Sequence, residues 1–233
     1  IQHQLDGRSD ISLSAGNTGV LLVISRMILK MIEDVSKPAL AGLWPSQNGM
    51  NVVLDLGANI ECNEKNLTDF ACMGSALFKS LFNSNLPKLA LLNVGLEEIK
   101  GNDVLKKTYS TLKENKIKNF DFCGYIEGNH IMDGEIDVIV TDGFTGNIAL
   151  KTSEGIARFI SSTLKDEFKK NVFAKIAGIS SAKVLNSFKK VVDPRRYNGA
   201  SLIGLKGIII KSHGGADSFA FNNSLKIALK EVN

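Results

Sequence analysis

The sequence is poor in the residues that build disulfide frameworks and metal sites. Only three cysteines occur in 233 residues, with no CxxC spacing and no pair of histidines nearby. We interpret Cys62, Cys72 and Cys123 as reduced core thiols of a cytosolic protein. The three histidines lie far apart in the sequence and show no metal-ligand spacing. We therefore expect neither a metal site nor a bound cofactor.

Several common catalytic signatures are also missing. The chain has no GxGxxG dinucleotide fingerprint, no GxxxxGK[ST] loop, no HExxH pair and no GxSxG elbow. Its most apolar run, Val20 to Ile32, is interrupted by Arg26 and Lys30 and is too short to span a bilayer. We interpret that run as a buried helix.

The chain carries only a small excess of positive charge. The formal net charge is +4, with 44% hydrophobic and 22% charged residues, which is ordinary for a globular protein. This balance does not indicate a nucleic-acid partner, but it suits acidic partners or an anionic surface. A chain of 233 residues is long enough to bury a real core, and we expect a single domain over residues 1–233.

The most informative stretch is a short apolar strand, Asp137–Thr141, that runs into the turn Asp142–Asn147. Similar strand-to-turn transitions, each rich in glycine and asparagine, occur at Ser14–Gly19, Asp55–Asn59 and Asn93–Asn102. In an α/β sheet, ligands bind outside the carboxyl ends of the strands, where turns expose backbone N–H groups and helix N-termini. We therefore expect these turns to assemble one site.

Strands and helices alternate along the chain, which predicts a mostly parallel sheet with helices on both faces, a three-layer α/β/α fold. We expect a loop through Gly42, Pro45 and Gly49, because glycine and proline punctuate it. After Pro194 we expect the chain to return to the sheet as a strand over Lys206–Lys211.

Residues 151–192 differ from the rest, because apolar residues keep helical spacing opposite lysines. They predict a projecting amphipathic helical hairpin with an apolar tip at Phe173, Ile176 and Ile179, flanked by Lys169 and Lys170 among other lysines. One interpretation is an arm that packs against a second subunit. Another is contact with an anionic membrane surface, since apolar residues with flanking lysines insert at such interfaces. The two interpretations are compatible.

The residues alone indicate an α/β enzyme that handles an anionic, phosphate-bearing ligand. Exposed N–H groups of glycine turns, together with Lys100 or Lys151, make a cradle for an anion. Asparagine side chains beside these turns can donate to a developing oxyanion. Asp55 and Asp142 are equally explained as helix caps.

Six motifs occur here in one order: SAGNTG (14–19), LDLGAN (54–59), NVGLEEIKGN (93–102), DGFTGN (142–147), DPRRYNGA (193–200) and SHGGAD (212–217). Together they resemble the bacterial acyl-carrier-protein:phosphate acyltransferases of phospholipid synthesis, over nearly the whole chain. The resemblance implies transfer of a long-chain acyl group from acyl-carrier protein to inorganic phosphate, giving acyl phosphate. It also implies an isocitrate/isopropylmalate-dehydrogenase-like fold, a homodimer, and a cytoplasmic location with peripheral membrane association.

With the resemblance in hand, we expect the Gly16–Gly19 and Gly143–Asn147 turns to hold phosphate, with Lys100 neutralising its charge. Asn17, Asn102 or Asn147 would donate to the thioester carbonyl, and His213 would protonate the leaving thiolate. The remaining expected phosphate or substrate contacts are Gly16, Thr18, Gly19, Asp55, Asn59, Glu98, Asp142, Gly143, Thr145 and Gly146.

The chain departs from the family pattern in two places. Family members begin with a strand and an Asp-Ala-Met-Gly-Gly-Asp stretch that has no match here, so we expect an N-terminal segment to be absent. Leu96 stands where relatives commonly carry a third acidic residue.

Rival functions stay open at this point. One is a short-chain phosphotransacylase that uses coenzyme A, and another is a non-catalytic membrane-surface scaffold that binds acyl-carrier protein. A decarboxylating dehydrogenase would need arginines clustered at strand ends, which the five arginines here do not provide.

Overall fold

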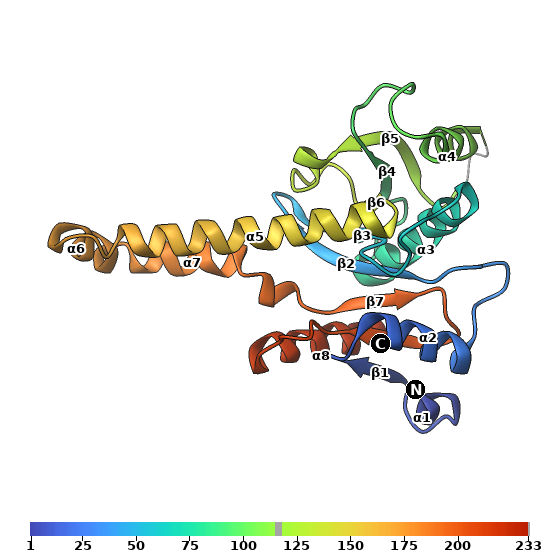
Figure 1. Ribbon diagram of the computed structural model, residues 1–233, viewed down its shortest axis with the longest axis horizontal. Coiled ribbons are helices and arrows are strands. Elements are labelled where there is room, and N and C mark those ends of the chain that lie inside the picture. The colour runs from blue at the N-terminus through green and yellow to red at the C-terminus, as the bar shows by residue number, and fades with distance from the viewer. Residues whose placement is uncertain (115–117, 233) are drawn as a thin grey trace.

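The computed structural model describes residues 1–114 and 118–232 (Figure 1). Its strands are β1 Ile11–Ser14, β2 Ala39–Ser46, β3 Gly49–Leu54, β4 Lys88–Asn93, β5 Asp121–Glu127, β6 Val138–Val140, β7 Ala200–Ile203 and β8 Ile208–Lys211. Its helices are α1 Gln2–Leu5, α2 Thr18–Leu29, α3 Glu64–Phe82, α4 Asp103–Glu114, α5 Gly143–Glu167, α6 Val172–Ser180, α7 Ala182–Val192 and α8 Ser218–Val232, with short 3-10 turns η1 Gly128–His130 and η2 Pro194–Tyr197.

The strands form one eight-stranded sheet in the order β1-β8-β7-β2-β3-β6-β4-β5. It contains two parallel groups, β1 with β8 and β3 with β6, β4 and β5. Between them, β7 and β2 pair antiparallel with each other and with their outer neighbours. The sheet is therefore mixed, and its two parallel groups run in opposite directions.

One predicted element is wrong, and one strand was not predicted. The loop expected through Gly42 and Pro45 is the buried strand β2, which pairs with both β3 and β7. The strand predicted over Lys206–Lys211 is β8. A strand that was not predicted, β7, precedes it, so this region contributes two strands to the sheet. Strands β2 and β7 lie at the centre of the sheet, where backbone pairing on both sides outweighs the local effect of glycine and proline.

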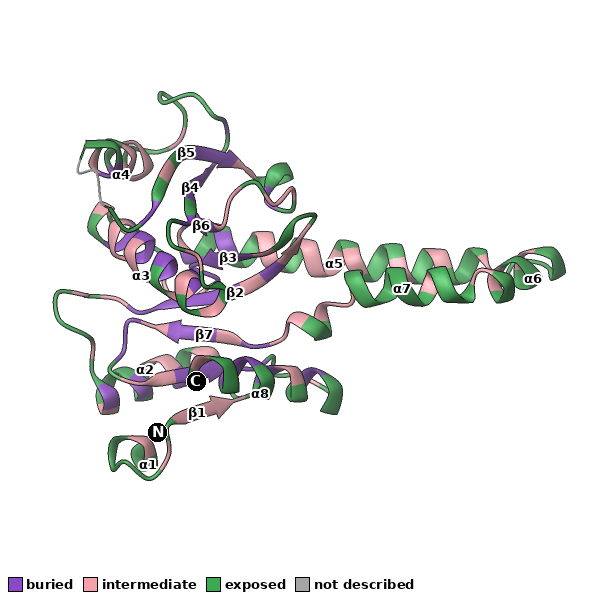
Figure 2. Ribbon diagram, turned by 180° about the vertical axis from the view of Figure 1, so that it is seen from behind, coloured by how far each residue is buried: buried purple, intermediate pink, exposed green. Residues whose placement is uncertain are grey.

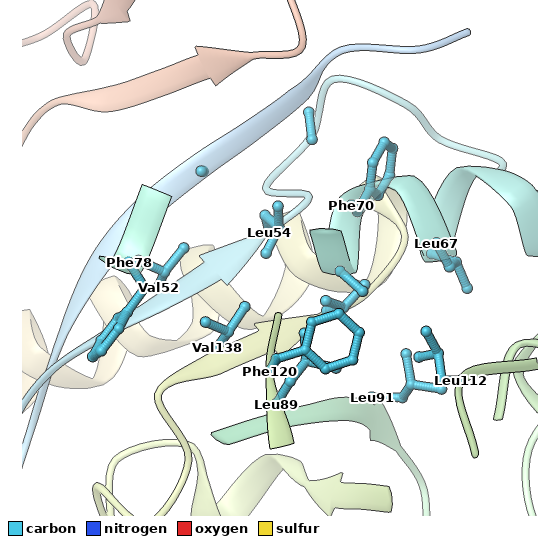
Figure 3. Close-up of a cluster of buried hydrophobic side chains, with 14 of the residues drawn as sticks. Val52, Leu54, Leu67, Phe70, Phe78, Leu89, Leu91, Leu112, Phe120 and Val138 are labelled. Atoms are coloured by element: carbon cyan, nitrogen blue, oxygen red, sulfur yellow. The ribbon is translucent and has the colours of Figure 1, made fainter. Parts of the chain in front are cut away.

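Helices cover both faces of the sheet, which confirms the predicted three-layer α/β/α architecture. On one face, α3 and α4 pack their apolar side chains on alternate residues of β3, β4 and β6, as Figure 3 shows for Phe70, Leu54 and Val138. On the other face, α2 and the first turns of α5 cover the intervening residues, such as Val53 and Ile139. The period of two along each strand produces this division.

A long arm leaves the body of the protein (Figure 1). Helix α5 continues well past the sheet, and α6 and α7 fold back alongside it. The three helices are mostly exposed or half-buried, as Figure 2 shows; α6 and α7 bury no residue. In the described part of the chain, no helix combines the length and the apolar character that a membrane crossing requires.

Candidate active site

Asp55, at the end of β3, organises its own turn. Its Oδ1 accepts hydrogen bonds from the backbone N–H groups of Leu40, Gly57 and Ala58 at 2.9, 3.2 and 3.0 Å. Its Oδ2 accepts from the backbone N–H of Asn59 at 2.7 Å and from the Asn59 side chain at 2.8 Å. Burial raises the pKa of Asp55, although these donors oppose the shift. Both Asp55 and Asn59 therefore bind the chain itself.

The turn Asp142–Asn147 is locked onto the Asp55 turn by backbone contact. Gly143 donates to the carbonyl oxygen of Asn59 at 2.8 Å. A Cβ on Gly143 would lie 2.4 Å from that oxygen, and a Cβ on Gly146 would lie 1.9 Å from the carbonyl oxygen of Asp55. Glycine is needed at both positions because another strand-end turn approaches so closely. Asn147 lies beside Gly57, within 3.3 Å of the position of a Cβ there.

Asp142 caps helix α5. Its Oδ1 accepts from the backbone N–H of Thr145 at 2.8 Å, and its Oδ2 from the Thr145 hydroxyl at 3.0 Å. Such a cap satisfies a helix N-terminus that would otherwise be open to an anion. The predicted substrate contacts Asp142 and Thr145 therefore pair with each other.

The Asn93–Asn102 turn follows β4, which is parallel to β6, so it lies at the same edge of the sheet as the Asp55 turn. Asn102 caps α4 by accepting from Leu105 N–H at 2.9 Å. Glu98 accepts from the Tyr109 hydroxyl at 2.8 Å and from Lys113 Nζ at 2.6 Å, and the Lys113 contact is the main reason that its pKa is lowered. Lys100 is exposed, and within the described residues it forms no ion pair.

The turns after β1 and β8 lie at the opposite edge, because this parallel group runs against the other. The structure thus separates the Ser14–Gly19 turn and His213 from the turns that carry Asp55, Lys100 and Asp142. Asn17 caps α2, accepting from Val20 N–H at 3.1 Å, while Gly16 donates to the Ser14 hydroxyl at 3.1 Å. Thr18 and Gly19 form the first turn of α2.

His213 is exposed, in a turn that lies beside the Ser14 turn. Ser212 donates to the carbonyl of Ser14 at 2.9 Å, and Gly214 approaches the carbonyl of Ala15. His213 Nδ1 accepts from Gly215 N–H at 3.1 Å, which leaves Nε2 to carry or release a proton.

Asn198, in the Asp193–Ala200 motif, holds this turn in place. It accepts from the backbone N–H of His213 at 2.8 Å, and its side-chain nitrogen lies 2.8 Å from the hydroxyl of Ser212 and 2.7 Å from that of Ser224 on α8. The sequence of the motif alone does not indicate this role of Asn198.

Lys211, the last residue of β8, was also missed. It is only 9% exposed, and its Nζ donates a hydrogen bond to the carbonyl oxygen of Ser212. Within the described residues it has no carboxylate partner. Burial lowers the pKa of Lys211, and repulsion from Lys151 on α5 lowers it further. A lysine that ends an apolar strand just before Ser212 and His213 is the sequence signal that identifies it.

Helix α5 connects the two edges of the sheet. It begins at the Asp142 turn and carries Lys151, two turns later, into electrostatic range of Lys211. A candidate site for an anion is therefore Lys211, beside the Ser212–His213 turn, together with Lys151, which also pairs with Glu154 at 3.4 Å. We call it the lysine site.

The predicted membrane or partner contacts are all on the arm. Phe173 and Ile179 on α6 are 85% and 77% exposed, and Ile176 is also exposed. Lys169 and Lys170 lie between α5 and α6, where Lys170 pairs with Glu167 at 2.6 Å.

Comparison with known proteins gives a consistent answer. A family model described as "Fatty acid synthesis protein" matches residues 1–233. The phosphate acyltransferase of Pelagibacter ubique HTCC1062 is 56% identical over 232 residues, covering all of this chain and 70% of that protein. The phosphate acyltransferase of Methylococcus capsulatus Bath is 46% identical over 226 residues, covering 97% of this chain and 66% of that protein. The chain thus spans about two thirds of the length of these relatives.

Solved structures share the fold at low sequence identity. A branched-chain phosphotransacylase from Enterococcus faecalis V583 superposes with a TM-score of 0.66 and 15% identity, covering 100% of this chain and 77% of that one. The EutD phosphotransacetylase from Staphylococcus aureus gives a TM-score of 0.58 and 16% identity, covering 99% of this chain and 66% of that one. The full-length family match and the 56% identity carry the conclusion that this chain belongs to the phosphate acyltransferase family.

Proposed function

We propose that the protein transfers a long-chain fatty acyl group from acyl-carrier protein to inorganic phosphate, forming an acyl phosphate for phospholipid synthesis. The single observation that carries this proposal is the 56% identity to a phosphate acyltransferase over the whole chain. The matching model of a fatty acid synthesis protein supports a long-chain acyl substrate.

The reaction needs little from the protein beyond positioning and charge. A phosphate oxygen attacks the thioester carbonyl, the new C–O bond forms, and the C–S bond breaks to release the carrier thiolate. Phosphate dianion is already nucleophilic, so holding it next to the thioester supplies much of the rate. Donors aimed at the carbonyl oxygen stabilise the tetrahedral intermediate.

The lysine site is the best candidate for holding phosphate. A buried ammonium group without a carboxylate partner is costly, and a bound dianion offsets that cost. Lys211 meets this description, and Lys151 adds a second positive charge. Lys100 remains the alternative clamp, exposed at the opposite edge of the sheet.

His213 and Asn147 each neighbour one of these lysines in the sequence, although Asn147 also lies beside Gly57 at the other edge of the sheet. His213 lies two residues after Lys211, and its free Nε2 suits protonation of the leaving thiolate. Asn147 lies one turn before Lys151 on α5. We propose that Asn147 donates to the thioester carbonyl and that Asn17 and Asn102 act as helix caps.

The test of the activity is a turnover assay. Palmitoyl-acyl-carrier protein and phosphate are supplied, and acyl phosphate is trapped with hydroxylamine. Phosphate-dependent product supports the proposal, whereas turnover only with acetyl-coenzyme A would identify a short-chain phosphotransacylase. Binding of the carrier protein without product from either donor would indicate a scaffold.

The choice between the two clamps is tested by Lys211→Met and Lys100→Ala. Lys211→Met is expected to raise the KM for phosphate at least about tenfold, since a charge-assisted contact is worth about 1.5–3 kcal/mol. Lys100→Ala is expected to leave the KM for phosphate within about twofold of the parent value, as for an exposed charge. The reverse result assigns the clamp to Lys100.

Peripheral membrane contact and homodimer formation are proposals about the arm. The exposed apolar residues of α6 support the first, and exposed apolar residues along α5 and α7, such as Phe159 and Val184, support the second.

A further inference from the structure

A hollow of about 350 Å³ lies where the arm joins the body of the protein. Residues from the end of α7, from η2 and from the start of α8 line it. We call it the base pocket, and its lining is Asn186, Lys189, Lys190, Asp193, Arg195, Arg196 and Phe219. Four of these seven side chains are cationic and one is acidic.

The acidic group and one of the cations are used to build the pocket. Arg195 pairs with Asp193 at 2.7 Å and with Asp217 at 2.7 Å. The guanidinium groups of Arg195 and Arg196 both lie 5.4 Å from the centre of the Phe219 ring. The hydrogen bonds from Arg195 are the main cause of the lowered pKa of Asp193, so this carboxylate stays charged and occupied. The framework is therefore fixed by ion pairs and cation–π contacts.

The other cations have no acidic partner among the described residues. Among residues 1–114 and 118–232, Lys189, Lys190 and Arg196 form no ion pair, and all three are exposed. Their charges point to an anionic partner with several negative groups, because like charges grouped on one surface attract such a partner and speed its encounter.

The pocket is directly connected to the candidate active site. Asp217, which holds Arg195, belongs to the same Ser212–Asp217 turn as His213. Asn223 on α8 donates to the carbonyl of Arg195 at 3.0 Å, and Asn198, three residues beyond Arg195, fixes the backbone of His213. A partner bound in the base pocket is therefore adjacent to the turn that carries His213.

We propose that the base pocket is the docking site for the acidic surface of the acyl-bearing carrier protein, with Lys189, Lys190 and Arg196 contacting its carboxylates. This inference rests on the proposed function, because the carrier protein is the acyl donor there. Position favours this partner over a lipid surface, since the pocket adjoins the His213 turn, whereas Phe173, Ile176 and Ile179 are exposed on α6, which lies at the far end of the arm (Figure 2).

The test is the double variant Lys189→Glu/Lys190→Glu, with Lys106→Glu/Lys107→Glu as the control. The control makes the same charge change at an adjacent lysine pair on α4, away from the pocket. The pocket variant is expected to raise the KM for palmitoyl-acyl-carrier protein at least about tenfold, with kcat and the KM for phosphate unchanged. The control is expected to stay within about twofold of the parent.

Direct binding of palmitoyl-acyl-carrier protein, measured by fluorescence anisotropy, separates this inference from the proposed function. Loss of binding only in the pocket variant supports the docking site even if no acyl phosphate is formed. Equal binding and equal KM in the parent and the pocket variant overturn it. Loss of co-sedimentation with anionic vesicles, with carrier binding unchanged, would also overturn it and identify a lipid contact.

Discussion

Most polar residues of the motifs are used to build turns. Asn17, Asn102 and Asp142 each cap a helix, and Asp55 accepts only from its own chain. Caps and ligand contacts require the same residue types at the same place, the start of a helix after a strand. The sequence therefore located the turns correctly, but it could not distinguish a side chain that closes a turn from one that faces a ligand.

Gly146 provides a test of this interpretation. Gly146→Ala places a Cβ 1.9 Å from the carbonyl oxygen of Asp55, so one of the two turns must move. We expect a loss of about 1–3 kcal/mol in the free energy of unfolding, measured in urea, because overpacking costs about this much.

Gly155→Ala is the control on the same helix. Nothing lies within 4 Å of its Cβ position, and alanine there is expected to stabilise by about 0.5–1 kcal/mol. Equal effects at the two positions would contradict the proposed close contact.

Lys211 predicts opposite pH dependences for stability and for phosphate binding. Burial and the nearby Lys151 lower its pKa below 10.5, so between the folded and unfolded pKa values the unfolded chain binds more protons. Stability relative to Lys211→Met therefore rises with pH in this window. Phosphate binding weakens over the same range, because the ammonium charge is lost.

Thermal unfolding and the KM for phosphate, measured between neutral and alkaline pH, check this prediction. In Lys211→Met, we expect that the rise in stability and the weakening of phosphate binding with pH, both attributed to Lys211, disappear. Parallel pH profiles in the parent and the variant would show that Lys211 is not the group that titrates.

At the level of elements, the sequence predicts the fold class and the parallel strands well, but it fails at the two strands that decide how the site is assembled. Strand β2 contains Gly42 and Pro45, and β7 follows Gly199 closely. Glycine and proline in or next to these strands argue against a strand in the sequence. Both strands form nevertheless, because they pair with strands far away in the sequence. Because β2 and β7 pair antiparallel, the parallel strands on one side of them run opposite to those on the other side. The turns that were predicted to form one cluster therefore lie at two opposite edges of the sheet.

The Asp55 turn gives an element-scale prediction, since this one carboxylate joins the start of β2 to the turn after β3. Asp55→Asn replaces an acceptor oxygen with an amide group that faces N–H donors. We expect a loss of at least about 2 kcal/mol in the free energy of unfolding, because buried donors are left unsatisfied.

The measurement is urea unfolding, with Asp142→Asn as the matched control. Asp142 also accepts hydrogen bonds at a strand end, where it caps α5, but it makes two contacts, both to Thr145. Loss of the Asp142 cap is expected to lower the free energy of unfolding by about 1 kcal/mol. A smaller effect at Asp55 than at Asp142 would show that the Asp55 turn does not depend on the carboxylate.

At the level of the whole molecule, helix α5 joins three regions that look independent in the sequence: the turn beside Asp55, the lysine site and the arm. Helix α5 starts in the turn locked to Asp55, carries Lys151 toward Lys211, and continues as the first limb of the arm. A rigid helix of 25 residues couples the position of the arm to the position of the lysine site. The arm is thus placed to hold the site at a fixed distance from whatever its tip contacts.

The tip of the arm gives the last prediction. Phe173→Asp/Ile176→Asp puts two charges on the exposed apolar surface of α6, where burial in a lipid interface would be costly. We expect this variant to lose co-sedimentation with vesicles of anionic phospholipid, with turnover of soluble palmitoyl-acyl-carrier protein unchanged. Met27→Asp, at a position 74% exposed on α2, is the control and should co-sediment like the parent. If the double variant instead keeps vesicle binding and becomes monomeric in sedimentation velocity, the tip is a contact between subunits.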